Sequence, residues 1–199
     1  QHPIVGYNGT ISYPETESNL NIIEVGTYQT AAWIRLNKYT SEGSAISDRT
    51  FPYTGASDIK RTLDDNFILQ GLYKQDCIIG DSVLNSNGEE DAFIAKIDTS
   101  FNTIWIKYGG GLFRDELKSI TLLVDGSIIS TAHFRGTINF DSVQFSGGTV
   151  SDDMWSAILK FDSEGELVWL KKIGENYVEP SSQNWFPTNI GNLWQYHSH

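Results

Sequence analysis

The sequence has one cysteine, one methionine and five prolines, and this scarcity excludes several classes of protein. Cys77 has no partner for an intrachain disulfide, so a disulfide-stapled domain is excluded. It stands in an apolar run with no histidine nearby, which favours a small buried hydrophobe over a reactive thiol. No stretch approaches the roughly 20 apolar residues of a membrane-spanning helix. We therefore expect no membrane insertion.

Basic residues are also few. The chain has 14 Lys and Arg against 25 Asp and Glu, for a formal net charge of −11, and it contains no run of Lys or Arg. The phosphate backbone of a nucleic acid and an anionic lipid surface would both be repelled by such a surface. A nucleic acid is therefore excluded as the expected partner.

Aromatic residues make up 13% of the chain, and glycines are also plentiful, with 18 residues. This combination is typical of short strands joined by tight turns. A helical turn at 114–123 is the one helix considered, and its match to an earlier segment favours a strand there. The sequence thus predicts an all-β fold.

A repeat supports this prediction. Residues 66–71 align with 126–131, and residues 81–83 with 141–143, at an offset of 60. Residues 95–98 align with 159–162, and 104–107 with 168–171, at an offset of 64. The four extra residues fall in one loop, at 146–153, as a repeat array tolerates. A weaker unit at 32–37 resembles 92–98, with Ile46 or Ser47 in place of the expected Trp.

Each unit contains four main strand-like runs, so we interpret it as one four-stranded blade of a β-propeller. In the middle unit the runs are 57–63, 66–73, 76–84 with 92–98 following, and 103–108. In the last unit they are 118–124, 127–134, 137–145, 155–161 and 167–173. Turn signals at 64–66, 87–88, 125–126, 147–148 and 164–165 separate them, and Asp-Gly and Asn-Gly favour the primed turns of hairpins. The flexible corner at 107–111 is expected to connect two blades.

The expected divisions of the chain are an N-terminal segment at 1–17, a degenerate blade at 18–54, blades at 55–110 and 111–174, and a tail at 175–199. Three blades cannot close a ring, because propellers use four to eight. An incomplete ring exposes strand edges and blade faces to other chains. We therefore expect further blades or further copies of the chain as partners, with segment 1–17 able to donate a strand.

The segment 91–98, Asp-Ala-Phe-Ile-Ala-Lys-Ile-Asp, followed by Trp105 and Gly109-Gly110, resembles the propeller repeat of large secreted bacterial proteins. Asp115, Asp125-Gly126 and Gly136 fit the rest of that repeat. The resemblance covers about residues 57–174, and it implies a secreted or cell-surface protein. The tail from Trp185 to Tyr196 resembles segments of secreted proteins from the same bacterial group.

The resemblance also implies structural roles for recurring positions. The motif at 162–169 is similar to the Asp-box and tryptophan-docking motifs of propellers, in which an Asp and a Gly shape a hairpin and a Trp packs between blades. The structural repeat positions are Lys96, Asp98, Trp105, Lys160, Asp162 and Trp169.

A weak candidate for a calcium loop comes from Asn85, Asn87, Glu89 and Asp91, whose oxygens alternate along a loop. The segment lacks the initial Asp and the fixed Gly of a true calcium loop, so a solvated turn is the alternative and no cofactor is expected. His2, His133, His197 and His199 are scattered, and no Ser-His-Asp set or Cys-His pair can be assembled. The paired carboxylates at 89–90 and 152–153 flank turns. We expect no enzyme.

The leading hypothesis is an extracellular, non-enzymatic structural protein that assembles through its blades. One alternative is a carbohydrate-binding, lectin-like propeller with glycans as partners, and another is a fragment of a larger secreted propeller protein. Asn8 lies in a glycosylation sequon, whose use depends on the host.

Overall fold

The computed structural model describes residues 10–14, 19–28, 31–40, 42–141, 143–146 and 154–173. These residues form sixteen strands and contain no helix. The first part contains β1 (Thr10–Pro14), β2 (Asn19–Tyr28), β3 (Ala31–Thr40) and β4 (Ala45–Pro52). The middle part contains β5 (Thr54–Arg61), β6 (Phe67–Tyr73), β7 (Cys77–Ile79), β8 (Ser82–Leu84), β9 (Asp91–Ile97) and β10 (Thr103–Gly110). The last part contains β11 (Glu116–Leu122), β12 (Ile128–Arg135), β13 (Thr137–Phe140), β14 (Val143–Ser146), β15 (Met154–Phe161) and β16 (Leu167–Ile173). The all-β prediction is confirmed, and β11 is extended rather than helical.

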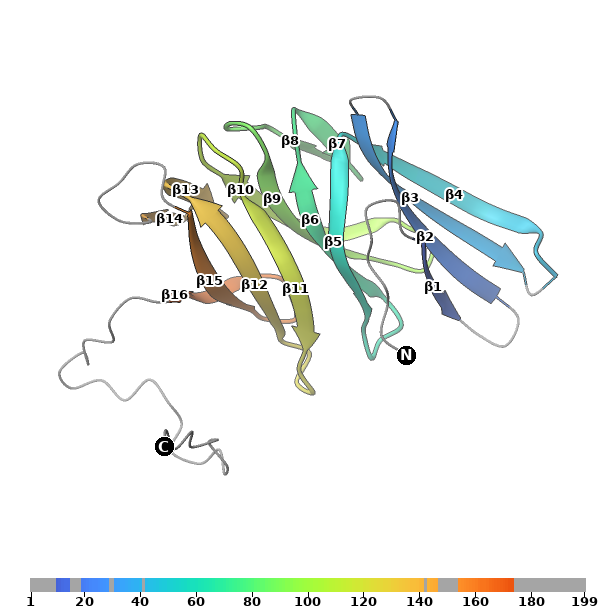
Figure 1. Ribbon diagram of the computed structural model, residues 1–199. Coiled ribbons are helices and arrows are strands. Elements are labelled where there is room, and N and C mark those ends of the chain that lie inside the picture. The colour runs from blue at the N-terminus through green and yellow to red at the C-terminus, as the bar shows by residue number, and fades with distance from the viewer. Residues whose placement is uncertain are drawn as a thin grey trace, which may run out of the picture.

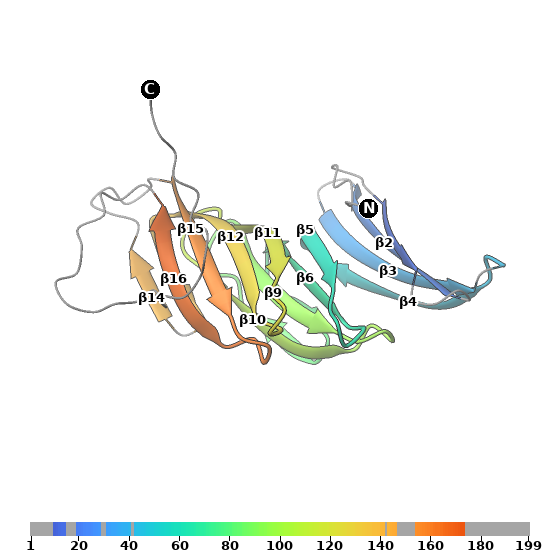
Figure 2. The same cartoon turned by 90° about the horizontal axis from the view of Figure 1, so that it is seen from below.

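Three antiparallel sheets stand in a row along the chain (Figures 1 and 2). The first sheet has the order β1-β2-β3-β4, and the last sheet has the order β11-β12-β15-β16. The middle sheet has the order β14-β13-β10-β9-β6-β5, and β7 and β8 form a separate hairpin. No closed barrel or closed propeller ring forms within these described residues.

The middle sheet is larger than the four strands expected of it, because the β13–β14 hairpin joins its edge. The alignment assigned these residues to the last unit, yet Gly109 and Gly110 of β10 pair with Phe140 and Asn139 of β13. A Cβ atom on Gly109 would collide with the backbone of β13. The glycine pair therefore permits a close backbone approach between two successive units, rather than forming a flexible corner.

The hairpins β3–β4, β9–β10 and β15–β16 end in the same kind of turn. In the last of them, the Gly165 amide donates to the Asp162 carbonyl at 3.2 Å, and the Asp162 amide donates to the Glu166 carbonyl at 3.0 Å. The residue two positions before the second strand takes a positive φ in each turn, at Gly43 (85°), Phe101 (65°) and Gly165 (85°). These connections are one residue longer than the primed turns that the sequence predicted, and the left-handed residue accommodates the extra length.

Strand pairing shows that the alignment of the second strand was wrong by one residue. Phe67 pairs with Ile97 in the middle sheet, and Ile128 pairs with Phe161 in the last sheet. The equivalent of Phe67 is therefore Ile128, not Ser127. Because successive side chains of a strand point to opposite faces, this correction exchanges the two faces of the strand.

The alignment of the fourth strand is confirmed. Trp105 pairs with Lys96 in the middle sheet, and Trp169 pairs with Lys160 in the last sheet. In the first sheet the corresponding pair is Lys38 and Ser47. Ser47 thus stands where the repeat has its Trp, as one of the two expected alternatives placed it.

The first sheet uses more of the N-terminus than the predicted unit at 18–54. Residues 10–14 form β1, which pairs with β2 of the same chain, from Thr10 opposite Glu24 to Pro14 opposite Leu20. Part of the segment expected as a donated strand is thus a strand of the chain's own first sheet.

Two apolar layers hold the sheets together, one between each pair of neighbours. Phe93 and Ala95 of β9 contribute to the layer shared with Ile34 of the first sheet, whereas Ala92 and Ile94 contribute to the layer shared with the last sheet. All five of these side chains are buried. The middle sheet is therefore apolar on both faces, which explains why its strands lack a clean polar alternation.

Candidate functional site: the uncovered face of the last sheet

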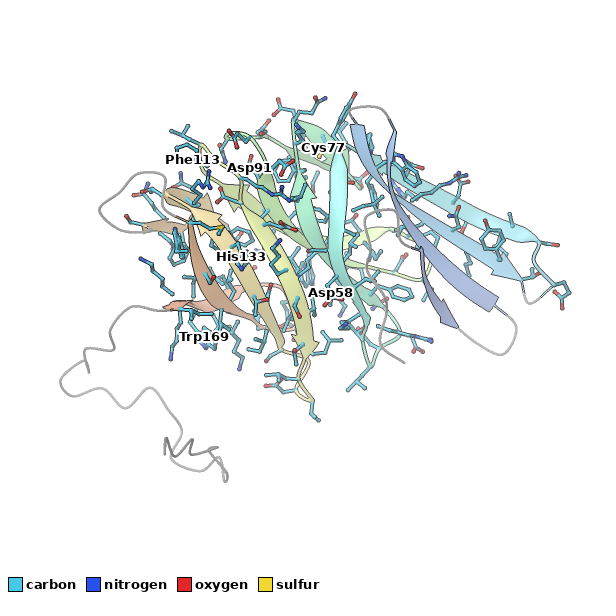
Figure 3. All side chains as sticks on the ribbon, viewed as in Figure 1. Asp58, Cys77, Asp91, Phe113, His133 and Trp169 are labelled. Atoms are coloured by element: carbon cyan, nitrogen blue, oxygen red, sulfur yellow. The ribbon has the colours of Figure 1, made fainter. Side chains whose placement is uncertain are left out.

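The contact between the middle and last sheets, here called the internal interface, combines apolar packing with buried hydrogen bonds. The Ile120 amide donates to Asp58 Oδ2 at 2.8 Å, and Asp58 lies between the two sheets in Figure 3. The Ser130 hydroxyl donates to Gln70 Oε1 at 2.7 Å, and both residues are fully buried. These polar bonds fix the register of the two sheets, because leaving either group unpaired in the interior would cost stability.

Trp105 packs across the internal interface on the turn of the next unit. A Cβ atom on Gly165 would lie only 2.7 Å from the indole ring of Trp105. Glycine therefore serves two purposes at this position, since it allows a φ of 85° and leaves room for the ring. Beside it, Lys107 Nζ contacts Glu166 at 2.9 Å and Asp141 at 3.3 Å.

Lys107 responds to these neighbours with a raised pKa. Burial alone would lower the pKa of this ammonium group, but the hydrogen bond to Glu166 and the charge of Asp141 outweigh it. A ring contact from Trp105 and a charged contact from Lys107 thus lie side by side between the middle and last sheets.

The last sheet presents the equivalent face, which no further sheet covers within the described residues (Figure 2). The members of this uncovered face follow from the pairing of β12, β15 and β16. The central ones are Ile129, Thr131, His133, Met154, Ser156, Ile158, Lys160, Trp169, Lys171 and Ile173.

Exposure separates this face from its counterpart in the middle sheet. Ile94 is fully buried against the last sheet, whereas its equivalent Ile158 is partly exposed. Met154 and Ile173 are 65% and 51% exposed. Trp169, labelled at the edge in Figure 3, is partly exposed, as is Trp105, and Lys171 Nζ lies 5.5 Å from the ring centre of Trp169. The uncovered face therefore has the chemistry of an interface without a described partner.

The aspartates among the structural repeat positions accept hydrogen bonds from backbone amides of their own turns. Asp98 Oδ1 accepts hydrogen bonds from the amides of Ser100 and Asn102, both at 2.8 Å. Asp162 Oδ1 accepts equivalent bonds from Glu164 at 3.1 Å and Glu166 at 2.8 Å. Although burial would raise the pKa of Asp98, its hydrogen bonds from Asn102 and Ser100 produce a net lowering.

Lys96 binds a different turn of its own sheet. Its Nζ lies 2.8 Å from Asp64 Oδ2, and this hydrogen bond is the main reason why the pKa of Asp64 falls to about 2. Lys160 is half-exposed on the uncovered face.

The four residues of the candidate calcium loop do not converge. Asn85 accepts a hydrogen bond on its backbone carbonyl from the Tyr73 hydroxyl at 3.0 Å, and the Asn87 amide donates to Asp91 Oδ2 at 2.6 Å. Glu89 is exposed, whereas Asp91 is fully buried. The described part of the chain contains no group of three or more His, Cys, Asp or Glu side chains arranged to hold a metal ion.

Asp91 is instead close to a second buried carboxylate, that of Asp115, with Gly110 between them. A Cβ atom on Gly110 would collide with Asp91 Oδ1 and lie 2.8 Å from Asp115 Oδ2. Asp115 accepts hydrogen bonds from the amides of Gly111 at 2.6 Å and Arg135 at 2.8 Å. Asp91 Oδ1 has no hydrogen-bond partner among the described residues.

Burial raises the pKa of both carboxyl groups, that of Asp115 to about 7. The negative charge of Asp91 adds to this effect on Asp115, and the two amide hydrogen bonds oppose it. Two carboxyl groups supply fewer oxygens than the six to eight that Ca²⁺ prefers. Their geometry and raised pKa values favour a partly protonated buried pair over a cation site. The sequence singled out both aspartates as motif positions, but it could not show their proximity.

A groove of about 440 Å³ lies between the turns at one end of the middle and last sheets. Its lining includes the aliphatic side chains of Leu63, Ile68 and Val124, together with Lys96 and Asp64. None of its described lining residues is aromatic, although a sugar-binding site would normally use an aromatic side chain for stacking. This groove therefore does not favour the carbohydrate-binding alternative.

The remaining candidate residues that the structure describes, Cys77 and His133, do not form a site together with other candidates. Cys77 is buried, and burial together with Asp76 raises the pKa of its thiol to about 11. His133 is exposed on β12. His2, His197, His199, Asn8 and the carboxylates at 152–153 lie outside the described residues. No helix that could span a lipid bilayer occurs in the described ranges.

Comparison with known proteins adds no family to this description. None of the protein-family models matches the chain, and a search of curated proteins gave no significant match. Function is therefore inferred from the residues and contacts of the chain itself.

Proposed function

We propose that the chain is an extracellular, non-enzymatic structural protein whose sheets act as propeller-like blades and associate with further blades or further copies of the chain. The observation that carries this proposal is the uncovered face of the last sheet. It repeats the Trp, the Lys and the central Ile of the face that the middle sheet buries in the internal interface.

Apolar exposure supports the same proposal. Met154, Ile158, Trp169 and Ile173 stand together on one face of adjacent strands. Met154 and Ile173 are exposed, and Ile158 and Trp169 are partly exposed. Contiguous apolar surface of this kind marks interaction sites in soluble proteins. Ile94, the equivalent of Ile158 in the middle sheet, is buried against the last sheet, which indicates that the face of another sheet is the shape of partner that fits.

The contact between the middle and last sheets points to stacking of sheet faces. The middle sheet already continues into the β13–β14 hairpin, so its β10 edge is occupied. The contact between the middle and last sheets is a face-to-face contact, with the Trp105 ring on a turn and Lys107 beside it. Extracellular location is part of the proposal through the resemblance of segment 91–98 to the secreted repeat.

Sedimentation or light scattering of the 199-residue chain over a wide concentration range tests the proposal. We expect a mass above that of one chain, decreasing on dilution, and a loss of association when Ile158 is replaced by a charged residue. Val83→Glu is a suitable control, because Val83 is exposed on the separate β7–β8 hairpin. A mass of one chain at all concentrations would contradict the proposal.

A further inference from the structure

The turns between the third and fourth strands differ in a way that depends on the preceding sheet. Gly165 in the last sheet receives Trp105 from the middle sheet. At the equivalent turn of the middle sheet stands Phe101, which is fully buried, and the preceding sheet has Ser47 in place of the Trp. A turn with a large residue thus follows a sheet with a small side chain at the Trp position, and a turn with a small residue follows a sheet with the Trp.

The first and last of the three sheets each carry one half of a Trp–Gly contact that has no partner among the described residues. Trp169 on the last sheet has the place of Trp105, and Gly43 on the first sheet has the place of Gly165, with the same φ of 85°. No described atom lies within 4 Å of a Cβ placed on Gly43, whereas Gly165 is covered by an indole ring. Gly43 is also exposed.

We propose that the partner of the uncovered face is the first sheet of a second copy of this chain, with Trp169 of one copy packed on the Gly43 turn of the other. This inference rests on the proposed function and specifies its partner and contact. The chain carries both halves of a contact that it already makes internally between Trp105 and Gly165.

The geometry of the internal interface also predicts which side chains lie beside this ring contact. Lys107 accompanies Trp105 and contacts Glu166, the residue that follows Gly165. By the same register Lys171 accompanies Trp169, and Ser44 follows Gly43. In the assembled protein Lys171 of one copy and Ser44 of the other therefore lie side by side.

Two copies joined at both ends provide six sheets, within the four to eight that closed propellers use. A closed pair and an open chain of copies use the same contact, because both join the last sheet of one copy to the first sheet of the next.

The test begins with the association of the unmodified chain by sedimentation, which checks the proposed function alone. Trp169→Ala and Gly43→Ala should then each weaken association at least tenfold. Gly126→Ala is the matched control, because Gly126 has nearly the same φ (83°) in a turn of the same hydrogen-bonding pattern. It should lose similar folding stability and keep the association constant.

Crosslinking tests the same contact without removing the indole ring, so it remains informative if Trp169→Ala perturbs the fold. Native Cys77 is buried, so Ser44→Cys and Lys171→Cys each add one accessible thiol. A short bifunctional maleimide should link the two variants when they are mixed, and neither variant should link efficiently to itself.

The outcomes separate the two proposals. Association that withstands Trp169→Ala and Gly43→Ala, with no crosslink in the mixture, would overturn the head-to-tail contact and leave the proposed function standing. A chain that stays single at every concentration would overturn both.

Discussion

Raising the pH should weaken the fold through the buried carboxyl group of Asp115. Its pKa rises from an ordinary 3.8 to about 7 in the folded protein, because burial disfavours the ionised form and Asp91 is close. The folded state therefore holds a proton more tightly than the unfolded chain. This contribution to stability is complete below pH 3.8 and is lost as the pH rises through 7.

The size of the effect follows from the shift in pKa. One pKa unit corresponds to about 1.4 kcal/mol, so a shift of about three units corresponds to a loss on the order of 4 kcal/mol. That is a large part of the roughly 5–15 kcal/mol that stabilises a typical domain. Asp91 acts in the same direction, since its pKa is also raised. Asp64 acts in the opposite direction, but only as the pH falls through its pKa of about 2.

The assay is urea unfolding followed by tryptophan fluorescence at a series of pH values, at a protein concentration low enough to suppress association. We expect the free energy of unfolding to decrease between pH 4 and pH 8. Asp115→Asn stays neutral, so most of this decrease should disappear. The variant should also be less stable at low pH, because an amide has one acceptor oxygen for the two amides of Gly111 and Arg135.

Two results would refute this reasoning. Stability that is constant or increasing from pH 4 to pH 8 would show that Asp115 is not protonated in the folded protein. A decrease of the same size in Asp115→Asn would assign the pH dependence to other groups.

Three further predictions concern the interior. Gly71→Ala should lower the melting temperature strongly, because its Cβ would collide with the Gly55 carbonyl, whereas Gly55→Ala should be tolerated with a Cβ 3.5 Å from the nearest side chain. Ser130→Ala should cost about 1–3 kcal/mol in urea unfolding, because Gln70 Oε1 loses its buried donor, and an unchanged stability would contradict the role of this bond. Cys77 should be unreactive to a thiol reagent in the folded protein and reactive in urea, so rapid native labelling would contradict its burial.

The strands were predictable because hydrophobic runs and turn signals recur along the chain. Gly126 and Gly165 take the positive φ values expected of glycines in hairpin turns. The Asn87-Gly88 signal failed, since Gly88 lies against the backbone of Gly111 and Leu112 and does not close a hairpin. A dipeptide preference does not include such a tertiary contact, which decides the backbone path in that loop.

The candidate site was only partly predictable. Trp105 and Trp169 were identified as recurring positions, and the structure shows Trp105 on the neighbouring turn. Asp58, Gln70 and Ser130 were not identified, because polar residues in a strand carry no periodic signal that marks them as buried partners. Their roles depend on how two sheets face each other, which a single sequence does not encode locally.

The face of β12 shows why an assembly surface depends on register. The sequence alignment matched Phe67 with Ser127, and by that alignment Ile128 and Ser130 would lie on the side facing a following sheet. Strand pairing buries both of them against the middle sheet and directs Ile129 to the uncovered face. A shift of one residue therefore reverses which half of the strand a partner would contact, while leaving the predicted strand almost unchanged. Substitutions at Ile129 should affect association, and substitutions at Ile128 should affect folding.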